Sequence, residues 1–502
     1  MGFKRLWKSA EFWLIILFLI VLAIRLFIVF QTPYFNYEAY FSLRQADHIT
    51  KTGLPLYNDP LSYGGKIQLF APLQYYILAV FGFIFPIELV SKIVPNIFAA
   101  LVVIIIYFLA LKITKNPKIS LLTSFMAGFI PIMFLDINRI PVDYLAIVLI
   151  FSIIYCMFKI NERRYVDYLL ILIFLLVLTT PLAFILIIGL LLYMLLTKLE
   201  NLRVEMKESE IIMFFTFLVF WVNLLIYKNA FLKHGLVVIW QNTPVALLSN
   251  TFQSLTLLES FYTISIIPLI LGLYTSYLVF HKEKSKEILL LIGFGISSFL
   301  LLWFKLLSLV TGLVFLSLTL VVLSAFAIKK ISEFFDKTKF HRYRRIFLAL
   351  FILLFIISAI VPSVIIGVEK TRETPTTQDL VVLEWASERL PTDVTIASTY
   401  EEGSLVAYYT KRKNIMDNNF LLTPQIDQRL SDVDTIFTTR FETEAVPLLN
   451  KYNSKYIFLS DFARRKYMIT DLRYTSNQDC FSEEYYFNTT ILYNSKCKIT
   501  SG

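Results

Sequence analysis

Long apolar runs, separated by short loops that carry Lys and Arg, recur from residue 12 to residue 366 of this chain. Each run is rich in Leu, Ile, Phe and Val, and most are about 16 to 25 residues long, which suits helices that cross a hydrocarbon layer about 30 Å thick. Since 57% of all residues are apolar and only 17% are charged, the composition excludes an ordinary soluble protein. The chain is therefore predicted to be a polytopic α-helical membrane protein.

The basic clusters predict the orientation of the chain, because cytoplasmic loops carry the excess of Lys and Arg. Placing the N-terminus and every cluster inside requires about eleven spans and leaves the C-terminus outside. The expected spans are residues 12–30, 93–111, 119–135, 143–158, 168–180, 182–197, 211–228, 261–280, 288–304, 306–328 and 346–366. The net charge of +10 is explained by these clusters, so no nucleic-acid partner is predicted.

One apolar stretch does not fit this pattern. If residues 69–87 formed a simple span, every later basic cluster would lie outside. Pro72 and Pro86 interrupt the stretch, and we expect an interfacial or re-entrant segment, or half of a broken pair. Three segments are then expected on the outside, at residues 31–68, 136–143 and 229–260.

The composition changes after residue 366, the expected end of the transmembrane domain 1–366. Polar residues rise, and short strand-like runs at 394–398, 414–417 and 455–460 alternate with helical ones near 378–390, 403–410 and 442–453. Residues 367–502 are therefore predicted to form an extracytoplasmic α/β domain. Cys480 and Cys497 form a disulfide there or remain two free thiols.

The first outside loop brings acids, a histidine and many aromatic residues to the membrane surface. Glu38, Asp47, His48 and Asp59 are its candidate functional residues. A carboxylate there can act as general base on an acceptor, and aromatic rings stack on sugars. The alternative is a solvated loop with an interfacial aromatic belt.

The second outside turn carries Asp136, Arg139 and Asp143 between two apolar runs. Charged residues at such depth usually face a polar cavity or pair with one another. Lys305 lies between two spans near the outer surface and is a candidate for holding a phosphate, although snorkelling to the interface also explains it. Asp143 and Glu259 are candidate ligands for Mg²⁺ or Mn²⁺, and no motif requires either metal.

Taken together, these features resemble the C-type glycosyltransferase superfamily, most closely its branch of oligosaccharyltransferase catalytic subunits. The matching stretches are Pro33-Tyr34-Phe35-Asn36-Tyr37 through Gly53, Asp59-Pro60-Leu61-Ser62-Tyr63-Gly64-Gly65, Arg139 through Asp143, Leu383-Glu384-Trp385-Ala386, Thr395-Ile396-Ala397-Ser398 and Lys455-Tyr456-Ile457. Two departures stand beside them. Thr32 replaces the Asp that opens the family's first loop, so that Glu38 is the acid on offer, and Thr399-Tyr400-Glu401-Glu402-Gly403 keeps only the glycine of the WWDYG motif.

The resemblance implies an enzyme of the prokaryotic plasma membrane, archaeal or bacterial. It would transfer a sugar or glycan, with inversion, from a polyprenyl-phosphate or -diphosphate carrier to a protein or glycan acceptor at the outer face. Glu38 and Asp143 would be catalytic, and Arg139, Lys305, Asp59, Asp47 and His48 would bind substrate. A transporter or flippase of lipid-linked glycans, and a catalytically inactive scaffold, are the alternatives.

Overall fold

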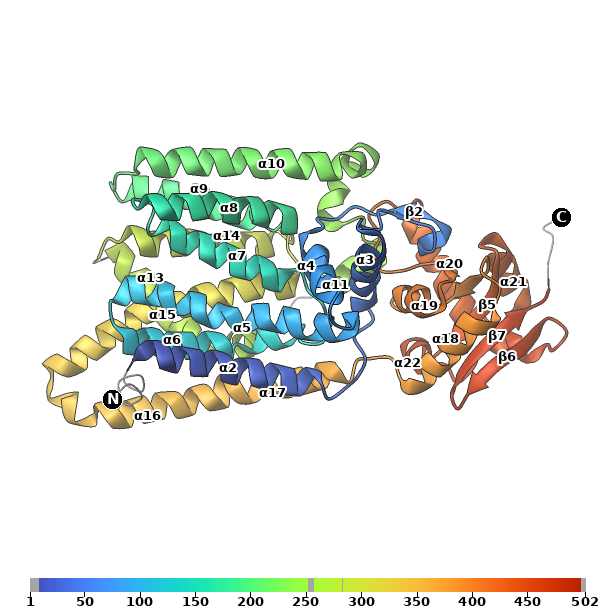
Figure 1. The fold of residues 1–502 in the computed structure, drawn as a ribbon. Coiled ribbons are helices and arrows are strands. Elements are labelled where there is room, and N and C mark those ends of the chain that lie inside the picture. Colours follow the sequence, from blue (N-terminus) through green and yellow to red (C-terminus); the bar gives the residue numbers. More distant parts are fainter. Residues whose placement is uncertain (1–8, 252–256, 282, 498–502) are drawn as a thin grey trace.

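A computed structural model describes residues 9–251, 257–281 and 283–497. Lys4, Arg5, Lys8 and Lys282 of the basic clusters, and residues 252–256 of the expected third outside segment, lie outside these ranges. Figure 1 shows a bundle of long helices and, at one end of it, a smaller domain that contains a sheet. The predicted class, a helical membrane protein with a C-terminal α/β domain, is confirmed.

Helices occupy every range that was expected to span the membrane. They are α2 (Ala10–Val29), α5 (Ile87–Thr114), α6 (Pro117–Gly128), α7 (Asp143–Met157), α8 (Arg163–Thr179), α9 (Ala183–Leu199), α10 (Met206–His234), α13 (Ile266–His281), α14 (Lys286–Trp303), α15 (Leu309–Lys337), α16 (Arg344–Phe355) and α17 (Val361–Thr371). In the described part of the chain, 6 helical stretches are long and apolar enough to cross a membrane by themselves. The total of about eleven spans stays a prediction.

The misfit stretch forms α4 (Leu73–Gly82), which packs against α3 (Ala39–Thr52) and α5. Ten residues of helix extend about 15 Å, half the thickness of a hydrocarbon layer. Both α3 and α4 lie at the end of the bundle that faces the C-terminal domain (Figure 1). This geometry suits the expected interfacial or re-entrant segment and not a span.

The C-terminal domain is built on a five-stranded sheet in the order β4-β3-β5-β7-β6. Strand β3 pairs in parallel with β4 and β5, whereas β7 is antiparallel to β5 and β6. Its elements are α18 (Thr377–Arg389), β3 (Thr395–Ala397), α19 (Gly403–Thr410), β4 (Lys413–Asn414), α20 (Ile426–Thr438), α21 (Glu442–Lys451), β5 (Ser454–Leu459), α22 (Asp461–Tyr467), β6 (Phe481–Phe487) and β7 (Thr490–Ser495). A disulfide between Cys480 and Cys497 joins the two ends of the β6–β7 hairpin.

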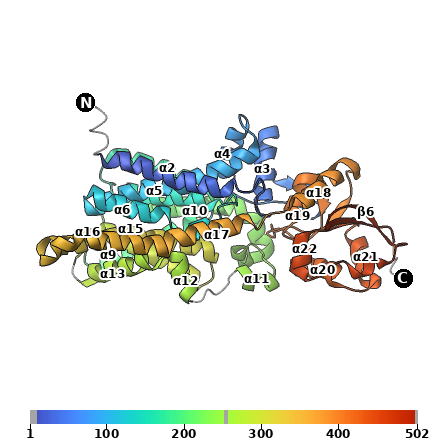
Figure 2. The ribbon, with the colours of Figure 1, turned by 90° about the horizontal axis from the view of Figure 1, so that it is seen from below.

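The first outside loop and the C-terminal domain share one hydrophobic core. Phe35, Tyr37 and Tyr40 of the loop are buried in the same cluster as Leu383 of α18 and Val406 of α19. Figure 2, seen from below, likewise shows α3 beside α19, which it contacts. Burial of this apolar surface fixes the domain against the bundle end from which the loop emerges.

A buried ion pair holds the far end of the same loop. Its short hairpin, β1 (Asn58–Asp59) and β2 (Lys66–Ile67), presents Lys66 to Asp417 of the C-terminal domain at 3.4 Å.

Gly403 at the start of α19 has no alternative residue, because a Cβ there would collide with the carbonyl of Met416. The chain segments before and after β4 are therefore packed closely against each other.

Candidate functional site

The first outside loop and the second outside turn lie against each other. The backbone N–H of Asn36 donates to the carbonyl of Asn138 at 3.3 Å, and the Asn138 side-chain amide donates to the carbonyl of Tyr34 at 3.1 Å. The turn itself follows a short 3₁₀ helix, η2 (Pro131–Phe134), which comes directly after α6 in the chain. These contacts place Glu38 and Arg139 at one junction.

Arg139 is the centre of this junction. Its Nη1 lies 3.3 Å from Oε2 of Glu38 and 3.1 Å from Oδ1 of Asp136. Burial lowers the pKa of Arg139, but the carboxylates of Asp136, Glu38 and Glu373 outweigh that effect and raise it, so the guanidinium stays charged. The Glu38 side chain is 55% exposed and that of Arg139 34%, so both can meet a ligand.

The residues on either side of Glu38 are fixed by the C-terminal domain. The Tyr37 ring packs on Phe462 of α22 with centroids 4.7 Å apart, and Tyr40 lies 5.6 Å from Tyr408 of α19. Burial, together with the nearby carboxylates of Glu402 and Asp379, raises the pKa of Tyr37 far above its ordinary value. Glu38 is thus an exposed acid on a rigidly held segment, at the start of α3.

Asp143 begins α7 and is tied to a different helix. Its Oδ2 accepts a hydrogen bond from the Thr311 hydroxyl in the first turn of α15. Lys305 lies in the connection just before α15, where its carbonyl accepts from Nε1 of Trp240 at 2.9 Å and its side chain is exposed. The structure therefore links Asp143 to the segment that carries Lys305, without direct contact between the two.

The other candidates of the first loop lie elsewhere. Asp59 is fully buried, pairs with Arg44 at 2.7 Å and accepts from Gln68 at 2.8 Å, which makes it a structural anchor of the loop. Asp47 pairs with Lys51 at 2.7 Å on α3, about 13 Å along the helix from Glu38. His48 is its half-buried neighbour on the same helix.

The residues present do not fit a divalent metal. Within the described ranges, no three His, Cys, Asp or Glu side chains gather closely enough to hold an ion. Asp143 is engaged by Thr311, whereas Glu259 is exposed in the first turn of α12 (Leu257–Ile264). The oxygen ligands that Mg²⁺ or Mn²⁺ needs are therefore not assembled around either residue.

Arg25 is a buried charge that the sequence reasoning missed. It is 1% exposed within α2, and it donates to Asn96 Oδ1 at 3.0 Å, to the Met133 carbonyl at 3.1 Å and to the Tyr144 hydroxyl at 2.9 Å. The sequence feature that could have identified it is a single arginine inside an apolar run, where charged residues are rare and usually functional. These bonds fix η2 and the residue after Asp143, and so position the second turn.

Glu402 was also missed as a buried acid. It is fully buried at the start of α19 and accepts hydrogen bonds from Ser460 and Thr399. Burial raises its pKa to about 8, with the Ser460 hydroxyl opposing and the Asp379 carboxylate adding to the shift. Its neighbour Glu401 pairs instead with Lys466 at 2.8 Å.

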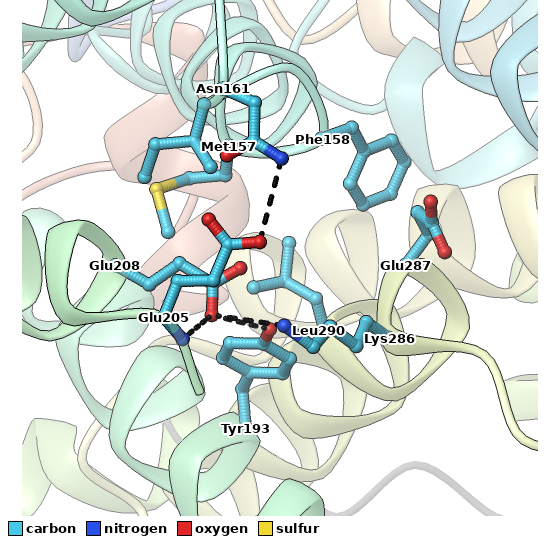
Figure 3. A pocket seen from close by; sticks show the side chains of 10 residues that line it. Met157, Phe158, Asn161, Tyr193, Glu205, Glu208, Lys286, Glu287 and Leu290 are labelled. Carbon is cyan, nitrogen blue, oxygen red and sulfur yellow. Dashed lines mark hydrogen bonds and ion pairs between the residues drawn. The ribbon is translucent and has the colours of Figure 1, made fainter. Parts of the chain in front are cut away.

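A polar cavity, shown in Figure 3, lies away from the junction, at the other end of α7 (Asp143–Met157). It is lined by Met157 at the end of α7, whereas Asp143 begins that helix. Glu208 in this cavity lies 3.6 Å from Lys286, and Glu205 accepts from Asn161 at 3.4 Å. These polar groups pair with one another and form a network at the helix ends.

Comparison with known proteins gives a match through structure alone. No family model and no curated protein matches the sequence. The apo oligosaccharyltransferase of Archaeoglobus fulgidus superposes with a TM-score of 0.70 at 16% identity, over 93% of this chain and 72% of that one.

Two further glycosyltransferases have the same arrangement. ArnT from Cupriavidus metallidurans bound to undecaprenyl phosphate gives a TM-score of 0.58 at 11% identity, over 97% of this chain and 98% of that one. The mycobacterial arabinofuranosyltransferase AftD gives 0.58 at 10% identity, over 96% and 42%. The resemblance predicted from the motifs is thus confirmed at the level of fold: this chain has the fold of the C-type glycosyltransferases.

Proposed function

We propose that the protein is a membrane glycosyltransferase that moves a sugar or glycan from a polyprenyl-phosphate or -diphosphate carrier to an acceptor at the outer membrane face. One observation carries the proposal. An exposed carboxylate, Glu38, and a charged guanidinium, Arg139, meet where two outside loops join beneath the C-terminal domain. This places a base and an anion-binding group side by side.

The proposed step is a displacement at the anomeric carbon. The acceptor nucleophile forms the new bond to that carbon while the bond from carbon to the carrier phosphate oxygen breaks, and attack from the opposite face inverts the configuration. Glu38 takes the proton of the nucleophile. Arg139 holds the departing phosphate, whose negative charge grows as the bond breaks, and Lys305 is the second cation assigned to it.

Two neighbours support the class of donor. The archaeal oligosaccharyltransferase is known in complex with an inhibitory peptide and a dolichol-phosphate, and ArnT is known bound to undecaprenyl phosphate. Both ligands are phosphates on a polyprenyl-type lipid. The exposed apolar side chains of Trp303 and Phe304, next to Lys305, offer a surface for such a chain.

A transfer assay tests this function. The purified chain in lipid nanodiscs is given radiolabelled polyprenyl-phosphate and polyprenyl-diphosphate sugars with a mixed pool of peptide and glycan acceptors. The expected result is a new glycosidic bond with one class of donor. In vesicles, movement of labelled lipid between leaflets without such a bond would instead establish a flippase.

A further inference from the structure

The carboxylates at the junction converge on a single atom. Glu38 from the first loop and Asp136 from the second turn each place one oxygen within 3.3 Å of the same nitrogen, Nη1 of Arg139. Two carboxylates that share one point create a position of strongly negative potential. A cation must fill that position, and in this protein the cation is the Arg139 guanidinium.

The fold holds the guanidinium in place. The Arg139 backbone N–H donates to the Asp136 carbonyl at 3.1 Å, and the adjacent Asn138 is bonded to the first loop on two sides. Nε of Arg139 is shielded from solvent and has no hydrogen-bond partner among the described residues. A buried donor of this kind calls for an acceptor, and the oxygen of a bound anion would supply one.

The same arrangement engages the carboxylates that a divalent ion would need. Mg²⁺ requires oxygen ligands at about 2.1 Å in near-octahedral geometry. The oxygens of Glu38 and Asp136 that would begin such a shell are already paired with the Arg139 guanidinium, which is positively charged as the metal ion would be. In addition, Thr32 stands where the family has an acid. One structure of the archaeal oligosaccharyltransferase is a complex with zinc and sulfate.

We infer that Arg139 takes the place of a divalent cation, and that this site binds an anionic lipid phosphate without a metal ion. The inference rests on the proposed function for the nature of the ligand. Its geometric part, a cation position filled by a side chain, is independent of any transfer reaction. Arginine suits this role because its remaining N–H groups form a planar fork that matches phosphate oxygens.

Mn²⁺ binding, followed by electron paramagnetic resonance on the purified chain in nanodiscs, tests the inference without any sugar donor. Wild type is expected to leave added Mn²⁺ free. Arg139→Gln removes the resident cation and leaves Glu38 and Asp136 facing one point, so its Mn²⁺ affinity is expected to rise at least tenfold. That gain should disappear in Arg139→Gln combined with Glu38→Gln.

Lys51→Gln is the matched control, because it removes one cation from the exposed pair with Asp47 on α3. It should not change Mn²⁺ binding. Stoichiometric Mn²⁺ binding by wild type that is lost in Glu38→Gln would overturn the inference. So would the absence of a gain in Arg139→Gln, provided that its thermal unfolding matches that of wild type. Failure of the transfer assay alone would count only against the proposed function.

Discussion

Glu38 and Arg139 form an ion pair of 3.3 Å across two segments that are distant in the sequence. The pair joins the start of α3 to the turn between η2 and α7, and it lies where the C-terminal domain covers the end of the bundle. An acid and a cation held on separate loops can each face a different part of a substrate.

Substitution of Arg139 should weaken the use of the lipid donor. Arg139→Gln removes the charge, and we expect kcat/KM for the donor to fall by about 100-fold, since a charge-assisted contact to phosphate contributes roughly 2 to 3 kcal/mol. Arg139→Lys keeps the charge but not the fork, and a smaller loss of about tenfold is expected. Steady-state kinetics with varied donor check this, and equal rates in all three proteins would contradict it.

Thr311 should matter through Asp143. Thr311→Val removes the hydroxyl that donates to Asp143 while keeping its shape, so the carboxylate loses its fixed orientation. We expect the transfer rate to fall about tenfold, a loss of roughly 1.4 kcal/mol, with little change in melting temperature. Thr216→Val, which removes only a bond to its own helix at Ile212, is the control. A loss of the same size in both variants would remove the role given to Thr311.

Arg25 should be a large contributor to stability. Arg25→Met leaves the Asn96 oxygen without its donor inside the bundle, whereas the Met133 carbonyl and the Tyr144 hydroxyl keep their bond to each other. A buried acceptor left unpaired costs about 1 to 3 kcal/mol, and the two weakened contacts add to this, so a drop of several degrees in the melting temperature is expected. Arg164→Met, at an exposed pair with Glu162, should leave it nearly unchanged. If the two variants melted together, Arg25 would not be the anchor of the second turn.

Glu402 should make stability depend on pH. Its pKa in the folded chain is raised to about 8, above the value of an exposed glutamate near 4.3, so the folded state binds the extra proton between those values. Stability from this group is therefore fully present below about pH 4 and is lost progressively as pH rises to about 8.

The matched variant is Glu402→Gln, which keeps the shape of the side chain and cannot ionise. We expect its melting temperature to change less than that of wild type between pH 5 and pH 8, and to exceed that of wild type at pH 8, where its free energy of unfolding should be higher by on the order of a few kcal/mol. Differential scanning fluorimetry in one detergent at several pH values measures this. Parallel curves for the two proteins would show that Glu402 is ionised in the folded chain.

The sequence predicted those features that depend on local pattern. Apolar run length placed a helix over every expected span, and alternation located β3, β4 and β5 to within a few residues. The β6–β7 hairpin escaped because its strand Phe481–Phe487 carries adjacent acids and tyrosines, with no clear alternation. The disulfide that closes this hairpin was therefore only one of two alternatives.

The contacts between distant segments that form the site could not be predicted from the sequence. The turn's composition predicted that Arg139 would face a polar cavity or pair with an acid, but the partnership with Glu38 depends on how two loops dock. Asp59 is also a carboxylic acid and lies on the same loop as Glu38, yet burial beside Arg44 gives it a structural role. No pattern along the sequence separates these two acids, because only the tertiary fold decides which one is exposed.

The most direct test of the account is the rate of sugar transfer by Glu38→Gln relative to wild type and Lys51→Gln, with the donor that wild type uses. Loss of a general base costs about 100-fold or more, so Glu38→Gln should fall by at least that factor while Lys51→Gln keeps the wild-type rate. Folding is checked by equal melting temperatures. Full activity in Glu38→Gln would contradict the central claim that this acid, held beside Arg139, carries the reaction.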